Sequence, residues 1–428
     1  MEANTQELLR FATAGSVDDG KSTLVGRLLH DTKSILVDTL AAVQFASRAK
    51  GLHETDLALL TDGLRAEREQ GITIDVAYRY FATARRSFIL ADTPGHVQYT
   101  RNMITGASTA ELALVLVDAR HGVVEQTRRH AAAVALLGVR HLVLAVNKMD
   151  LVNYDAARFA EIAGQFTQVA ASLGVTDATA IPVSALAGDN VVTRSRHMAW
   201  YVGPTLLEHL EQVPVGEDAA SEPLRFPVQY VIRPRSDLHH DYRAYAGKVA
   251  HGVVRVGDEV IIQPSGYRTT VTAIDGLDGP REYAVASQSI SLRLADDIDI
   301  SRGDLISSAY DLAPLTQDLT ADICILSDRL LGEGDLVLVQ HGTRTVQAKA
   351  NEVIARLDVA TLRPVEFAAP LGMNDIGLIR LRLAQPLPID NYARLRRTGA
   401  FLVIDAADGS TIAAGMSRTT TTEREFLS

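Results

Sequence analysis

The stretch GSVDDGKS at residues 15–22 decides how the first half of this sequence is interpreted. It fits the pattern G-x-x-x-x-G-K-[ST] of a phosphate-binding loop. An apolar run at 11–14 precedes it and TLVGRLLHD at 23–31 follows it, which is the strand–loop–helix context that the motif requires. The glycines let backbone N–H groups face phosphate oxygens, and a helix N-terminus favours negative charge. The alternative is a glycine-rich turn that matches by chance.

Apolar and amphipathic stretches alternate through residues 1–214. The apolar, strand-like runs lie at 11–14, 87–90, 112–117, 141–146 and 178–183, and helical patterns lie at 127–138 and 155–174. This alternation predicts βαβ units around a mostly parallel sheet that is covered on both faces. The segment VAYRYFATARRSFILAD at 76–92 predicts two strands around a short turn, and therefore one hairpin at the edge of that sheet.

The pattern changes near residue 215. VPVGEDAASEP at 213–223 is typical of a linker, and short β-rich runs separated by turns follow it. A second set of such runs begins near residue 315, and each set is typical of an all-β barrel. We therefore predict an α/β P-loop domain over 1–214 and two β-barrel domains over 222–311 and 312–428.

Two further elements would complete the phosphate end of a nucleotide site. DTPG at 92–95 ends a strand-like run, where the Asp92 carboxylate can hold Mg²⁺ through water and the Gly95 N–H can approach a γ-phosphate. Thr73, in the stretch Gly-Ile-Thr, can close over the nucleotide and complete the Mg²⁺ shell. Within the first motif, Lys21 supplies positive charge to the β- and γ-phosphates and the Ser22 hydroxyl can bind Mg²⁺.

Two more elements indicate which base is bound. NKMD at 147–150 follows an apolar run, and Asp150 can accept hydrogen bonds from guanine N1 and N2 that adenine cannot offer. SAL at 184–186 ends the last run and can support the base through backbone N–H groups. Each motif is weak alone, but together they lie at strand C-termini, where open α/β sheets bind ligands. The residues predict a Mg²⁺-dependent GTPase.

Two features near the phosphates allow more than one interpretation. His96 follows DTPG, where a histidine can orient the attacking water; the alternative is a solvent-exposed loop histidine without a role. Val17 and Ile72 are candidates for an apolar gate that keeps His96 away from the water, and plain packing is the alternative.

Composition limits the remaining possibilities. The net charge of -10 argues against a default of non-specific nucleic-acid binding, although a local basic patch stays possible. Cys324 is the only cysteine, so no intrachain disulfide framework can form; we expect it to be buried and the protein to lie in the reducing cytoplasm. No apolar stretch reaches about 18 residues, so we expect no transmembrane helix.

The motifs, together with DTPGH and REQGITI at 68–74, resemble those of the translational GTPase superfamily, whose members carry two β-barrels after the α/β domain. Further stretches resemble the large, GTPase subunit of the heterodimeric bacterial sulfate adenylyltransferase. Those stretches include GSVDDGKSTLVGRLL (15–29), ADTPGHVQYTRNMITGAS (91–108), WYVGPTLLEHLE (200–211), RFPVQYVIRP (225–234) and LADDIDISRGDLI (294–306). The similarity covers residues from about 8 to 417, and Asp19 stands where elongation factors usually have histidine.

The resemblance implies a function and a partner. A small subunit would form adenosine 5'-phosphosulfate and pyrophosphate from ATP and sulfate, and this chain would couple GTP hydrolysis to that uphill reaction, with GTP or GDP and Mg²⁺ bound. The predicted catalytic residues are His96, Lys21, Thr73 and Gly95, and the predicted metal ligands are Ser22, Thr73 and Asp92. The predicted nucleotide-binding residues are Gly15, Ser16, Val17, Asp18, Asp19, Gly20, Lys21, Ser22, Thr23, Asp92, Gly95, Asn147, Lys148, Asp150, Ser184, Ala185 and Leu186.

Some points depart from the family or stay open. The third domain is less similar: Ala400 replaces a usual serine, the stretch 332–346 lacks an expected Pro and Tyr, and Asn374 is retained. Some family members carry a fused adenylylsulfate kinase, and no second P-loop occurs here, so we expect either a stand-alone subunit or a piece cut after the third domain. The alternative functions are an elongation factor that carries aminoacyl-tRNA and a ribosome-bound factor; the barrel stretches count against both.

Overall fold

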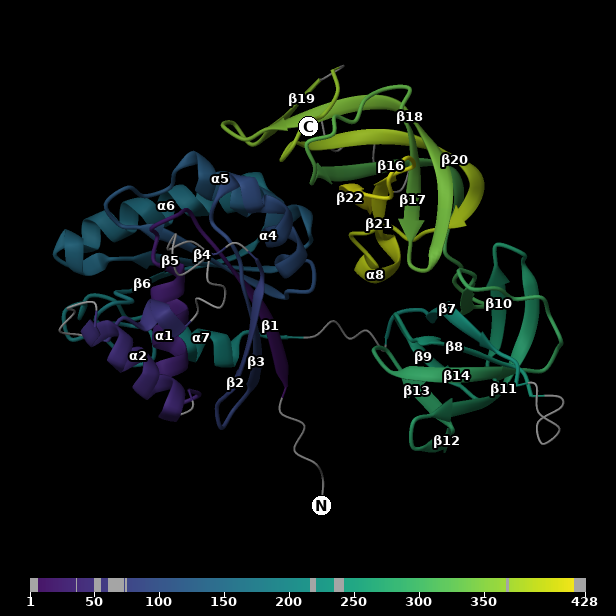
Figure 1. The fold of residues 1–428 in the computed structure, drawn as a ribbon, viewed down its shortest axis with the longest axis horizontal. Coiled ribbons are helices and arrows are strands. Elements are labelled where there is room, and N and C mark those ends of the chain that lie inside the picture. The colour runs from purple at the N-terminus through teal and green to yellow at the C-terminus, as the bar shows by residue number, and fades with distance from the viewer. Residues whose placement is uncertain are drawn as a thin grey trace. The chain divides into compact units, whose positions relative to one another are not determined.

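A computed structural model describes residues 7–35, 37–49, 55–60, 73, 75–215, 221–234, 242–366 and 369–418 (Figure 1). Contacts divide the chain into two compact units. The first comprises residues 1–215 with 358–363, and the second comprises residues 216–357 with 364–428. Both predicted barrels therefore lie in the second unit, and the separate boundaries at 222–311 and 312–428 remain predictions.

The first unit alternates strands and helices. Its strands are β1 (Leu8–Ala14), β2 (Ala77–Ala82), β3 (Ser87–Asp92), β4 (Leu112–Asp118), β5 (His141–Asn147) and β6 (Asp177–Pro182). Its helices are α1 (Lys21–Asp31), α2 (Val37–Ala49), α4 (Thr100–Ala107), α5 (Glu125–Leu136), α6 (Ala156–Ser172) and α7 (Leu206–Gln212), with 3₁₀ turns η1 (Leu57–Leu60), η2 (Val97–Tyr99) and η3 (Met149–Val152).

These strands form one six-stranded sheet in the order β2-β3-β1-β4-β5-β6. All neighbours pair in parallel except β2 and β3, which form the predicted antiparallel hairpin at the edge. Strand β1 begins three residues before the predicted start, since Leu8–Arg10 already pair with Ser87–Ile89. The parallel connections place the C-terminal ends of β1, β3, β4, β5 and β6 along one edge of the sheet.

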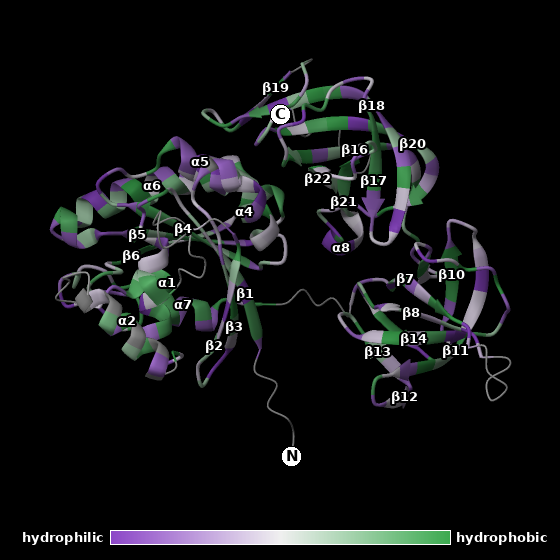
Figure 2. Ribbon diagram, viewed as in Figure 1, coloured by the Kyte–Doolittle hydropathy of each residue, from purple (hydrophilic) through white to green (hydrophobic). Residues whose placement is uncertain are grey.

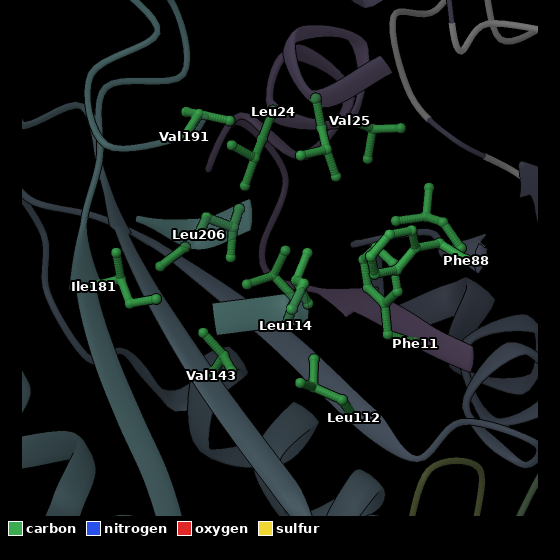
Figure 3. Close-up of a cluster of buried hydrophobic side chains, with 14 of the residues drawn as sticks. Phe11, Leu24, Val25, Phe88, Leu112, Leu114, Val143, Ile181, Val191 and Leu206 are labelled. Atoms are coloured by element: carbon green, nitrogen blue, oxygen red, sulfur yellow. The ribbon is translucent and has the colours of Figure 1, made fainter. Parts of the chain in front are cut away.

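A core between the sheet and its helices holds this unit together. Every residue of β4 is buried, as expected for a parallel strand that is covered on both faces. The central strands are largely apolar, whereas α5 and α6 alternate apolar and hydrophilic residues (Figure 2). Figure 3 shows buried side chains of this core, which include Phe11, Leu24, Val25, Phe88, Leu112, Leu114, Val143, Ile181, Val191 and Leu206.

The second unit contains two closed antiparallel sheets, as predicted. The first uses β7 (Arg225–Ile232), β8 (Ala244–Lys248), β10 (Glu259–Gln263), β11 (Tyr267–Gly276), β12 (Gly279–Arg281), β14 (Ser289–Leu294) and β15 (Leu305–Ser308), and β9 (Val253–Arg255) pairs with β13 (Tyr283–Val285). The second uses β16 (Leu315–Ile325), β17 (Leu336–His341), β18 (Arg344–Asp358), β19 (Arg363–Glu366), β20 (Ile376–Pro388), β21 (Ala400–Asp405) and β22 (Thr411–Ser417), with the short α8 (Arg396–Gly399). Pairing of β10 with β11, and of β17 with β18, closes each sheet into a barrel.

A buried guanidinium links the two barrels. Arg225, at the start of β7, is fully buried and donates to both carboxylate oxygens of Asp390 at 2.9 Å. It also donates to the backbone carbonyl of Asp311 at 2.7 Å and to the Asp311 carboxylate at 2.9 Å. Thr398 donates to Asp390 at 2.6 Å. A buried charge is tolerated only when its hydrogen bonds are made, as they are here.

Single residues of the second unit explain parts of its sequence. Cys324 is buried in β16, as predicted. Asn374 has φ of 68° in the turn before β20, a backbone region that asparagine tolerates better than most residues. Ala400 is the first residue of β21 and pairs with Met416. Among the described residues, no helix is long and apolar enough to cross a membrane.

Candidate nucleotide-binding site

The P-loop joins the end of β1 to the start of α1, as its motif requires. Gly20 precedes the first helical residue with φ of 90°, a left-handed conformation that favours glycine. A Cβ atom at Gly20 would lie 2.4 Å from Nδ2 of Asn147, so a side chain has no room there. The loop therefore packs directly against the residue that begins the NKMD motif, although the two are far apart in the sequence.

Lys21 places a positive charge inside the curl of this loop. Its side chain is buried, and Nζ donates to the carbonyl oxygens of Gly15 and Ser16 at 2.8 Å each. Burial lowers the pKa of Lys21, while the nearby carboxylates of Asp19 and Asp92 oppose that change. The ammonium group is thus held where it can turn toward an anion bound in the loop.

The Asp19 side chain folds back under the loop. Its carboxylate accepts the Ser16 N–H at 2.6 Å, and burial raises its pKa. The Ser16 hydroxyl is buried and has no hydrogen-bond partner within the described part of the chain. Such an unsatisfied donor in a rigid, glycine-rich loop fits a site that receives an oxygen-rich ligand.

The DTPG motif lies against the P-loop at the end of β3. Asp92 is buried, and its Oδ1 accepts the Thr13 hydroxyl at 3.0 Å, which anchors the carboxylate to β1. Thr93 donates its N–H to the Thr13 hydroxyl at 3.2 Å. A Cβ atom at Gly95 would lie 2.5 Å from the backbone carbonyl oxygen of Gly15 and 2.3 Å from Nζ of Lys21. Gly95 must therefore be glycine for the two motifs to approach this closely.

His96 directly follows this contact. Its side chain is partly exposed. Nδ1 can accept a hydrogen bond from the backbone N–H of Gln98, with 3.3 Å between the two nitrogen atoms. The ring is 6.0 Å from the Tyr99 ring. The histidine is therefore available to solvent beside the phosphate end, while Val17, the candidate gate residue, has 39% of its surface exposed. Ile72 and Gly71 lie outside the described residues.

Other predicted residues are placed but make no described contact that fixes a role. Ser22 and Thr23 lie on the first turn of α1, and both are partly exposed. Thr73 is described as a single, partly exposed residue. Leu186 is 61% exposed. Within the described ranges, no group of three or more His, Cys, Asp or Glu residues could hold a metal ion.

Asn147 connects the three parts of the site. It ends β5 and is buried, and its Nδ2 donates to the carbonyl of Asp19 at 2.8 Å. Its Oδ1 accepts the Ala185 N–H at 2.9 Å. One side chain thus holds the P-loop and the SAL segment in place at the same time.

Asp150 lies against the SAL segment. The Ser184 hydroxyl donates to Oδ1 of Asp150 at 2.6 Å. Ser184 does not use the other carboxylate oxygen, Oδ2. Arg27, from α1, donates to the carbonyls of Ala185 at 3.2 Å and Leu186 at 2.5 Å. The guanine-selecting carboxylate predicted from the sequence is therefore held by a residue of the neighbouring predicted motif.

Sequence reasoning missed an ionic group behind Lys148. Lys148 donates to the carbonyl of Asp18 at 2.5 Å and pairs with Asp118 at 3.0 Å. Arg120 holds the same Asp118 carboxylate with bonds of 2.6 and 3.0 Å. Burial raises the pKa of Asp118, but the hydrogen bonds from Arg120 and Lys148 outweigh it and bring that pKa below its usual range. Asp118 ends the run at 112–117, the same signal that located Asp92.

A second omission is Asn190, which follows the SAL segment. It is buried, with φ of 54°, and its Nδ2 donates to the carbonyl of Pro182 at 3.0 Å. Its Oδ1 accepts the Ser195 N–H at 2.8 Å. Nothing in the local spacing distinguishes this asparagine from an ordinary turn residue.

Known proteins resemble this chain over almost its whole length. A family model described as the elongation factor Tu GTP binding domain matches residues 6–215, and one described as a GTP-eEF1A C-terminal domain-like family matches residues 318–418. The chain is 56% identical over 410 residues to the bifunctional enzyme CysN/CysC of Mycobacterium tuberculosis (strain ATCC 25618 / H37Rv). The aligned residues make up 96% of this chain and 67% of that protein. Sulfate adenylyltransferase subunit 1 of Cellvibrio japonicus is 48% identical over 413 residues, or 96% of this chain and 86% of that protein.

The chain belongs to the sulfate adenylyltransferase subunit 1 family. Subunit 1 of Vibrio vulnificus (strain YJ016) is also 50% identical over 422 residues, which are 98% of this chain and 87% of that protein. The family predicted from the sequence is thus confirmed, and the likeness extends through both barrels. The solved structure of sup35 complexed with GDP covers 97% of this chain and 94% of that one at 23% identity, with a TM-score of only 0.44.

Proposed function

We propose that this chain is the GTP-hydrolysing subunit of sulfate adenylyltransferase. It drives formation of adenosine 5'-phosphosulfate from ATP and sulfate on a partner subunit, in sulfate assimilation. The observation that carries the proposal is the contact set of Asn147, which joins the P-loop to the guanine-selecting segment in a member of this family. A phosphate site and a guanine site on one sheet edge together form a site for GTP.

The phosphate end supports binding of GTP or GDP. Helix α1 begins directly after the loop at 15–20, so its N-terminus favours an anion bound there, and a phosphate could compete with Asp19 for the Ser16 N–H. The buried Lys21 ammonium group adds a full charge and has backbone carbonyls as its partners in the described contacts. A phosphate would offer it a stronger, charge-assisted hydrogen bond than those carbonyls do.

The residues present also suit Mg²⁺. The Ser22 and Thr73 hydroxyls and the Asp92 carboxylate are oxygen donors of the kind that Mg²⁺ takes together with nucleotide phosphates. The hydrogen bond from Thr13 holds Asp92 in a fixed orientation beside the P-loop, which suits a carboxylate that acts through water. When bound, Mg²⁺ would neutralise charge that develops on the β- and γ-phosphates.

His96 is the residue that we propose to position the attacking water. It follows Gly95, which lies against Lys21 and the P-loop backbone, so His96 would lie near the terminal phosphate of a bound nucleotide. Its ring is partly exposed, and its one described hydrogen bond is a long one from a backbone N–H. No strong hydrogen bond in the described contacts holds the ring, which would let it turn toward a water molecule.

Asp150 would select guanine. Ser184 engages only Oδ1 of Asp150, so a base can use the remaining acceptor capacity of the carboxylate for guanine N1 and N2. Adenine would leave that carboxylate unpaired in a partly buried position, and this cost discriminates against ATP. Lys148 pairs with Asp118 and donates to the Asp18 carbonyl, so it lies beside the P-loop.

The experiment that tests the function uses the chain together with its small subunit. Adenylylsulfate and pyrophosphate are measured from ATP and sulfate with GTP, with a non-hydrolysable GTP analogue, and without guanine nucleotide. GTP should raise the adenylylsulfate yield well above the equilibrium that ATP alone allows, and the analogue should not. An unchanged yield with GTP, in the presence of a small subunit that is competent for the ATP reaction, would overturn the proposal. The cytoplasmic location stays a prediction.

A further inference from the structure

The turn after the NKMD motif has a strained backbone. Asn153 and Tyr154 follow η3 directly and have φ of 52° and 56°. Two consecutive non-glycine residues with positive φ are uncommon, and a tyrosine is a poor choice for this region. Such conformations persist only where the surrounding structure holds them, and they gather at functional sites.

Four contacts hold Tyr154 in this conformation. Its N–H donates to the carbonyl of Met149 at 2.8 Å, and its carbonyl accepts the indole N–H of Trp200 at 3.0 Å. Its ring stacks on that of His197, with centroids 4.8 Å apart and an interplanar angle of 13°. Its hydroxyl donates to Oδ2 of Asp189 at 3.1 Å.

The hydroxyl contact is a bond between the two base-binding segments. Burial, and then the bond to Asp189, raise the pKa of Tyr154 to about 12, so its hydroxyl remains a proton donor at neutral pH. Asp189 lies three residues after the SAL segment, and its carbonyl accepts the Ser184 N–H at 3.1 Å. Ser184 in turn holds Asp150 at 2.6 Å.

These contacts close a ring around the guanine-selecting carboxylate. It runs from Asp150 to Ser184, then to Asp189, then to Tyr154, and returns through the Met149 carbonyl to the residue beside Asp150. The nearby aromatic rings of Phe159, Trp200 and Tyr201 pack behind it. Asp150 is therefore fixed from both of the segments that meet at the base.

We propose that Tyr154 and Asp189 are positioning residues that set the preference for guanine. The proposal rests on the function proposed above and adds to it the residues that hold the base-selecting group. Recognition of guanine needs both acceptor directions of Asp150 at once, so a small rotation of its loop weakens one of the two bonds. The phosphate end does not depend on this ring, because its contacts run through Asn147 and the P-loop.

The test compares two Tyr→Phe changes in the same aromatic cluster. Tyr154→Phe removes only the hydroxyl that reaches Asp189. Tyr201→Phe is the matched control, since its hydroxyl donates to the carbonyl of Pro204 at 3.1 Å, away from both base-binding segments. Dissociation constants for GDP and for IDP, whose base lacks the 2-amino group, are measured by calorimetry, along with phosphate release at saturating GTP.

For Tyr154→Phe we expect GDP affinity to fall roughly 3- to 10-fold, the loss equivalent to one hydrogen bond. Affinity for IDP should fall less, because inosine uses one bond to Asp150 where guanine uses two. The rate at saturating GTP and the behaviour of Tyr201→Phe should match the unmodified chain. Asp189→Ala should reproduce the effect, and the double variant should be no weaker than either single one.

Three results would overturn the inference. They are equal losses for GDP and IDP, an equal effect of Tyr201→Phe, and additive losses in the double variant. A merely structural role would give equal losses for both nucleotides with a lower melting temperature. Failure of the unmodified chain to bind GDP would instead contradict the proposed function, so the two failures are distinguishable.

Discussion

The phosphate end and the base end of the proposed site are built in different ways. At the phosphate end, the backbone determines the shape of the site: Gly20 has positive φ, and Gly95 lies so close to Lys21 that no Cβ atom fits. At the base end, side chains join distant segments, as Asn147 and Ser184 do. The phosphate end therefore tolerates almost no substitution at a few positions. At the base end, many residues each contribute a part of the geometry.

This comparison predicts that the largest losses come from the phosphate end. Lys21→Ala removes the one ammonium group inside the P-loop and should lower GTP turnover by roughly 1,000-fold or more. Phosphate release under single-turnover conditions measures it. Lys248→Ala, an exposed lysine on β8, is the control and should behave as the unmodified chain. Retention of more than a tenth of the turnover would show that backbone N–H groups suffice.

His96→Ala should affect hydrolysis but not binding. Loss of a water-positioning group slows the chemical step by about 100-fold or more, while the affinity for GTP should stay within about threefold because His96 supports no described part of the loop. Gln98→Ala removes an exposed neighbouring side chain and serves as the control. A large loss of GTP affinity would show that His96 supports the structure of the loop and does not act in hydrolysis alone.

Asp150→Asn tests the base end at its most specific residue. GTP affinity should fall roughly 10- to 100-fold, the loss expected when a charged acceptor of two hydrogen bonds is removed. The amide can donate to the C2 oxygen of xanthine, so the preference should shift toward xanthine nucleotides. Asp155→Asn makes the same change at the N-cap of α6, where the side chain accepts the Ala157 N–H, and should keep the preference for GTP. Unchanged base preference in Asp150→Asn would contradict the assignment.

The smallest effect should come from the support behind Lys148. Arg120→Ala leaves Asp118 paired with Lys148 and removes a side chain that is half exposed. Because Arg120 itself is half exposed and Lys148 still pairs with the buried Asp118 carboxylate, GDP affinity should fall only about twofold. Arg85→Ala removes another exposed arginine, which pairs with the less exposed Glu211, and provides the baseline. A tenfold loss would mean that the base end depends on single residues as strongly as the phosphate end does.

The same difference explains what could be predicted from the sequence. Strand, loop and helix around the P-loop are consecutive, so Gly20 and Lys21 could be identified from spacing alone. The α/β domain and both barrels were also correct, because apolar runs and turns are local signals. Strand β1 begins earlier than predicted because pairing of Leu8 with Ser87 extends it, and periodicity does not reveal such a partner.

The residues that were missed act through long-range contacts. Tyr154 and Asp189 are 35 residues apart, and each is an ordinary turn residue until the other is seen beside it. Asp118 could have been found, since it ends an apolar run as Asp92 does, but no familiar motif surrounds it. The stretch around Thr73 lies largely outside the described residues, so its predicted role in closing over the nucleotide stays a prediction.

The Arg225 cluster between the barrels has a consequence for anyone who recombines proteins of this family. Arg225 is contributed by one barrel, and Asp390 and Thr398 are contributed by the other. A chimera that exchanges only one barrel with a relative lacking these residues would break the buried two-bond pair between Arg225 and Asp390, a defect that costs several kcal/mol even though Asp311 still contacts Arg225. Crossover points for such chimeras therefore belong outside the pair, with both barrels inherited from one parent.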